Sequence, residues 1–81
     1  MMITVKLFAI IRDKVGSDSV KIELPECASV AVLLETLILT YPQLTDWKEV
    51  VRIAVNREYV DKNHIMKPGD EVAVIPPVSG G

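Results

Sequence analysis

The end of the sequence, Gly80-Gly81, carries the group with the clearest chemical potential, an α-carboxylate on a segment without side-chain bulk. An α-carboxylate is ionised at neutral pH and becomes an electrophile only after another molecule activates it. Glycine lacks a Cβ atom, so it permits backbone conformations and close approaches that other residues resist. The sequence therefore predicts that Gly81 is the reactive residue and that it enters a narrow channel on another protein.

The residues before this glycine pair predict how it is presented. Pro76 and Pro77 lack a backbone N–H, so they end any strand formed by residues 71–75. We expect a folded domain over residues 1–76 and a flexible tail over 77–81 that reaches up to ~17 Å when extended. The residues predicted to thread into the partner are Pro76, Pro77, Val78, Ser79 and Gly80.

The other reactive side chains do not form a catalytic set. Cys27 and His64 are the only residues of their types, and neither has a partner at metal-ligand or nucleophile–base spacing. We interpret Cys27 as a small buried thiol and His64 as a solvated surface residue. The chain is therefore expected to bind no metal or cofactor, and catalytic groups are expected on a partner.

Composition bounds the class of protein. With 81 residues, 49% hydrophobic and 25% charged, the chain is expected to form one globular domain. A net charge of −2 and scattered basic residues argue against nucleic-acid binding. The longest apolar run, residues 30–34, is too short to cross a membrane, and a single cysteine fits a reducing cytoplasm. We expect a cytoplasmic protein with neither nucleic acid nor membrane as a partner.

Hydrophobic periodicity predicts the elements that position the tail. Alternating apolar residues predict strands over residues 3–8, 20–24, 51–55, 59–60 and 71–75. Helical spacing predicts one long helix from Ser29, as the N-cap, to Pro42, and a short helical turn over residues 45–50. The fold class is α+β: a ubiquitin-like β-grasp, in which one main helix crosses a mixed sheet. Asn56 is expected to hydrogen-bond within its own turn.

Strand parity places Phe8 and Ile75 on the sheet face opposite the core, because Ile3, Val5 and Leu7 then face inward. The first and last strands of a β-grasp are parallel neighbours, so these two side chains are expected to lie close together. Exposed apolar residues beside the tail predict a docking surface, with Arg12 at its rim. The alternative is a strand bend that turns Phe8 into the core.

Four segments resemble the ubiquitin-like sulfur carriers that form the small subunit of molybdopterin synthase. They are Val5-Lys6-Leu7-Phe8-Ala9 with Arg12, Ala54-Val55-Asn56, Gly69-Asp70-Glu71-Val72 and Pro76-Pro77-Val78-Ser79-Gly80-Gly81. The resemblance covers the whole chain. Ile75 departs from an aromatic residue found there in some relatives.

The resemblance implies a route for the chemistry of Gly81. An adenylating (E1-like) enzyme would activate the carboxylate with ATP, and a sulfur donor would then convert it to a thiocarboxylate. That thiocarboxylate would donate sulfur for the dithiolene of molybdopterin, in a heterotetramer whose large subunit holds the catalytic residues. The same activated glycine also suits a ubiquitin-like protein modifier, or a carrier for tungsten-pterin, thiamine or tRNA thiolation.

Overall fold

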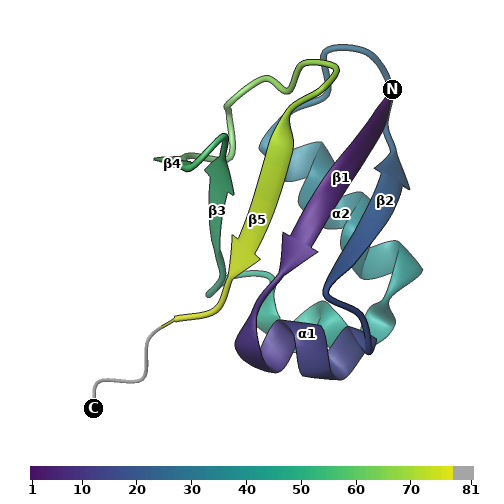
Figure 1. Ribbon diagram of the computed structural model, residues 1–81, viewed down its shortest axis with the longest axis vertical. Helices are drawn as coiled ribbons and strands as arrows, with labels where there is room; N and C mark the ends of the chain where they lie inside the picture. Colours follow the sequence, from purple (N-terminus) through teal and green to yellow (C-terminus); the bar gives the residue numbers. More distant parts are fainter. Residues whose placement is uncertain (78–81) are drawn as a thin grey trace.

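The computed structural model describes residues 1–77 and shows a five-stranded mixed sheet with helices against one face (Figure 1). The strands are β1 (Met2–Leu7), β2 (Ser19–Glu23), β3 (Arg52–Val55), β4 (Glu58–Val60) and β5 (Glu71–Ile75). The helices are α1 (Ala9–Val15), α2 (Val30–Thr40) and the 3-10 helix η1 (Pro42–Trp47). The predicted β-grasp fold is confirmed.

The sheet order is β2-β1-β5-β3-β4. The central pair, β1 and β5, is parallel, with Val5 opposite Val72 and Leu7 opposite Val74. All other neighbours are antiparallel. Because β1 and β5 run the same way, their carboxyl ends lie at one end of the sheet, where α1 also lies (Figure 1).

An aliphatic core fills the space between the sheet and α2. The inward side chains Ile3, Val5 and Val72 are fully buried, and Leu33 of α2 packs in the same cluster. Among the described residues no polar or charged side chain is buried. Removal of apolar surface from water is therefore the main stabilising term for this domain.

The long loop between β4 and β5 satisfies the first N–H groups of α2. The Val30 N–H donates to the His64 carbonyl (2.9 Å), and the Ala31 N–H donates to the Lys62 carbonyl (3.0 Å). The predicted N-cap is confirmed, since the Ser29 hydroxyl accepts from the Val32 N–H at 3.3 Å. His64, expected to be a solvated surface residue, lies in this loop and is half-buried.

Helix α1 was not predicted from the sequence. It spans only seven residues, and Ile11 is its one fully buried side chain, so it leaves almost no periodic signal. The helix begins at Ala9, whose backbone is unusual because its φ of 51° is positive although the residue is not glycine. Gly16 ends the helix with φ 87°.

Two further expectations were wrong. Cys27 is exposed rather than buried, because it lies in the turn before α2 with a positive φ of 61°. Asn56 does not bond within its own turn. Its amide donates to the Asp70 carboxylate (3.0 Å) and its carbonyl accepts from the Glu71 N–H (3.0 Å), so it ties the β3–β4 turn to the turn before β5. In that second turn Gly69 has φ 86°, a conformation that glycine adopts readily.

Candidate partner-docking site

The sheet face opposite α2 carries a hollow of about 330 Å³. Its lining comes from all three central strands, the β3–β4 turn and β4: Lys6, Phe8, Ala54, Arg57, Tyr59, Glu71, Ala73 and Ile75. Side chains alternate between the two faces of a strand. Val72 and Val74 of β5 point inward, so Glu71, Ala73 and Ile75 point outward. We call this feature the sheet-face hollow.

The two predicted docking residues meet in this hollow. Phe8 has an extended backbone (φ −126°, ψ 150°) at the start of α1, and its side chain is 44% exposed. Ile75, the last residue of β5, is half-buried. The expected outward orientation of Phe8 is confirmed, and the alternative of a strand bend into the core is wrong. The role of both residues in docking stays a prediction.

Arg12 lies apart from the hollow. Its backbone N–H donates to the Phe8 carbonyl one helical turn earlier (3.4 Å), but its side chain lines a separate depression with Gly16 and Ser17. There the Arg12 Nε lies 3.7 Å from the Asp13 carboxylate and 3.9 Å from that of Asp18. These exposed pairs contribute little to stability, and a contact of Arg12 with a partner stays a prediction.

The sequence analysis missed charged and aromatic residues in and beside the hollow. Arg57 and Tyr59 line the hollow, whereas Arg52 lies beside it against Tyr59. The Arg52 guanidinium lies 4.1 Å from the centre of the Tyr59 ring, a cation–π contact. The Lys6 ammonium lies 3.4 Å from the Glu71 carboxylate. Alternation within β3 was the available signal, because it puts Arg52 on the face opposite the buried Ile53.

The hollow adjoins the point where the chain leaves the sheet. β5 ends at Ile75, and Pro76 and Pro77 follow without strand structure, the first half-buried and the second exposed. The predicted tail residues Val78, Ser79, Gly80 and Gly81 lie outside the described residues. Their threading into a partner and the reaction at Gly81 therefore stay predictions.

Within residues 1–77 no three His, Cys, Asp or Glu side chains are grouped to share a metal ion. In the same range no helix has the length and apolar character needed to cross a membrane. What the site can do is present an apolar face with charged edges next to the departing chain end.

Fold and site together define a small β-grasp protein with a partly apolar hollow on its sheet face, beside its C-terminal segment. The model of the ThiS family matches residues 5–81, and the chain belongs to this family.

Relatives of known name cover nearly the whole chain. The molybdopterin synthase sulfur carrier subunit of Dictyostelium discoideum is 42% identical over 93% of this chain and 91% of its own length. The human protein of the same name is 35% identical over 98% and 93%.

Solved structures agree with these matches. A putative molybdopterin converting factor subunit 1 from Pyrococcus furiosus has a TM-score of 0.87 and 37% identity, covering 96% of this chain and 99% of its own. SAMP1 from Haloferax volcanii also has a TM-score of 0.87, with 28% identity over 100% of both chains. A complex of subunits 1 and 2 of the molybdopterin-converting factor from Helicobacter pylori matches with a TM-score of 0.73, at 28% identity over 100% of both chains.

Proposed function

We propose that this protein is the sulfur carrier subunit of a molybdopterin synthase and that Gly81 carries the sulfur. The observation that carries the proposal is the sheet-face hollow at the strand end from which the segment ending in Gly80-Gly81 departs. The relatives that bear this name, and the family match that extends to residue 81, support it.

The proposed chemistry begins with activation of the Gly81 carboxylate. Reaction with ATP forms an acyl adenylate and releases pyrophosphate, which gives the carboxyl carbon a good leaving group. A donor that delivers sulfur at the oxidation level of sulfide then displaces AMP and leaves a thiocarboxylate. Its sulfur attacks an electrophilic carbon of the pterin precursor and displaces an oxygen leaving group from that carbon. Water then cleaves the resulting thioester, which returns the Gly81 carboxylate and leaves the sulfur on the pterin as a thiolate.

The proposal assigns the catalytic groups to partners. The Helicobacter pylori structure pairs subunit 1 with subunit 2, and we propose that a large subunit likewise docks on the hollow of this chain and takes the tail into its active site. An adenylating enzyme would bind the same carrier before each transfer. Neither ATP nor the pterin is proposed to bind to this chain alone, and the cytoplasm is the proposed location.

A second candidate function is modification of other proteins through Gly81. It is favoured by the similarity to SAMP1 of Haloferax volcanii, because related structures name that protein small archaeal modifier protein 1. An acyl adenylate at Gly81 would react with a lysine amine to form an amide instead of accepting sulfur.

The decisive experiment is the mass of the C-terminal peptide from native cells. If the carrier function is right, the peptide should show the mass increase that follows from replacing one oxygen by sulfur. If the chain modifies proteins, Gly81 should be found linked to lysine.

A second test changes the tail. Deleting Gly81, or adding one residue after it, should abolish molybdopterin formation by the reconstituted synthase. Ser79→Ala, which keeps the length of the tail, is the control and should remain active. Full activity of the extended protein, with no trimming seen by mass spectrometry, would contradict the proposal.

A further inference from the structure

The row of residues across the hollow has two small side chains between two large ones, a shape that suits one kind of partner. We infer that Ala54 and Ala73 form a notch for a single bulky apolar side chain of the partner. We also infer that a carboxylate beside that side chain pairs with Arg57. This inference rests on the proposed function, because the partner is the subunit that receives the tail.

The notch follows from the register of four strands. Ala54 lies directly opposite Ala73, Tyr59 lies opposite Ala54 on its other side, and Lys6 lies opposite Ala73. The row is therefore large, small, small, large. Side chains directly opposite in a sheet have Cβ atoms about 5 Å apart, so two neighbouring methyl groups leave a depression between taller neighbours.

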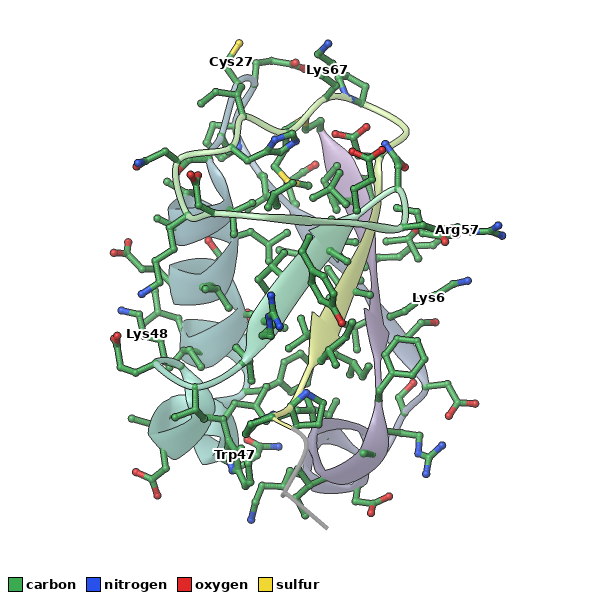
Figure 2. The ribbon with its side chains drawn as sticks, turned by 90° about the vertical axis from the view of Figure 1, so that its left-hand side faces the viewer. Lys6, Cys27, Trp47, Lys48, Arg57 and Lys67 are labelled. Atoms are coloured by element: carbon green, nitrogen blue, oxygen red, sulfur yellow. The ribbon has the colours of Figure 1, made fainter. Side chains whose placement is uncertain are left out.

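The partner's charge follows from the ion pairs of the face. Lys6 is matched by Glu71, whereas none of the ion pairs among residues 1–77 involves Arg57 or Arg52. Two cations thus lie on the Tyr59 side of the notch in a chain of net charge −2. Figure 2 shows Lys6 and Arg57 pointing away from α2, toward the same side of the sheet. A carboxylate on the partner would complement this side and orient the complex.

The backbone at Arg57 supports a role for its side chain. Asn56 and Arg57 both have positive φ, 52° and 73°, in the two-residue turn between β3 and β4. Glycine is the favoured second residue of such a turn, because a Cβ is strained there. The chain instead keeps a long cationic side chain at this position and directs it to the edge of the hollow.

The notch also limits where the partner's active site can lie. Gly81 is eight residues beyond Ala73 in the sequence, which spans at most about 28 Å of extended chain. A side chain seated in the notch therefore lies within that distance of the site that receives Gly81. Such an anchor fixes the start of the tail and reduces the freedom lost when the tail binds.

The experiment measures binding of the whole carrier to the large subunit by calorimetry. Ala73→Phe fills the notch. Thr4→Phe, the control, adds the same ring to the same face of the sheet, but on β1 and outside the lining of the hollow. We expect the dissociation constant to rise at least about tenfold for Ala73→Phe and to stay unchanged for Thr4→Phe. Equal dissociation constants for the two variants would overturn the inference that a partner side chain occupies the notch.

The charge is tested by Arg57→Glu against Lys48→Glu, a matched reversal on the α2 side of the molecule (Figure 2). Arg57→Glu should weaken binding and flatten its dependence on salt, and Lys48→Glu should change neither. Arg57→Gly relieves the positive φ, so it keeps the fold while removing the cation, and it should also weaken binding. Wild-type affinity and salt dependence in both Arg57 variants would overturn the pairing.

The outcomes separate this inference from the function on which it rests. If the wild-type carrier transfers sulfur and Ala73→Phe binds equally well, only the notch is wrong. If the wild-type carrier neither binds the large subunit nor transfers sulfur, the proposed function and the notch are both wrong. If Ala73→Phe abolishes a self-association seen by sedimentation while binding to the large subunit is unaffected, the occupant is a second copy and the inference is overturned.

Discussion

Phe8 lies between the end of β1 and the start of α1. It is 44% exposed and lines the hollow together with Ile75. Folding leaves nearly half of the surface of Phe8 in contact with water, and association with a partner can bury that remaining apolar surface. Its contribution to binding should therefore exceed its contribution to stability.

Replacing Phe8 or Ile75 by Glu should weaken binding to the large subunit strongly, because an unpaired charge placed in an apolar contact typically costs about 1–3 kcal/mol or more. Thermal unfolding should change little. Met2→Glu, on another exposed apolar residue at the other end of β1, is the control and should bind normally. If Phe8→Glu instead unfolds the domain, its ring stabilises the fold and the docking interpretation fails.

At the scale of elements, α1 is the least typical part of the fold. It is joined to β1 without a glycine, so Ala9 carries φ 51°, a conformation that costs an L-residue roughly 1–2 kcal/mol. The packing of Ile11 into the core and the Gly16 cap offset this cost. The strain is local and can be removed by a single substitution.

Ala9→Gly should raise the free energy of unfolding by up to about 1 kcal/mol, because relief of the positive φ outweighs the added entropy of the unfolded chain. The same substitution at Ala31, in the first turn of α2, should lower it by roughly 0.5–1 kcal/mol. Urea titration of the two variants measures both signs. A loss of stability in both would show that Ala9 is not strained.

At the scale of the whole molecule, the core lies in the folded domain, whereas the proposed delivery of Gly81 depends on the C-terminal segment. Among residues 1–77, the core cluster runs from Ile3 to Val74 and includes no residue after β5. The domain should therefore fold without its last residues, which then remain available for chemistry.

A chain ending at Pro77 should keep the wild-type melting temperature, because the truncation leaves the whole core cluster from Ile3 to Val74 in place. Leu33→Ala, at a fully buried position of α2, should lower the free energy of unfolding by about 2–5 kcal/mol, because it removes buried apolar surface and leaves a cavity. Calorimetry of both variants makes the comparison. A marked fall in melting temperature on truncation would mean that residues 78–81 contribute to the fold.

The sequence by itself determined the elements with strong local signals and the fold class that they imply. Alternation specified β1, β2, β3 and β5, because a one-residue slip would expose the core face of each strand. Ser29, Pro42 and the spacing of leucines specified α2, since capping and helical periodicity are properties of neighbouring residues. The outward orientation of Phe8 followed from the same parity.

Tertiary structure alone decided the features that depend on residues distant in the sequence. Helix α1 is held by the burial of one side chain and by contacts with η1, neither of which leaves a local pattern. Asn56 bonds to a turn fourteen residues away, and Cys27 is exposed by the path of a loop. The alanine notch exists because the register aligns Tyr59, Ala54, Ala73 and Lys6 across four strands, and strand pairing is a long-range property that no single segment specifies.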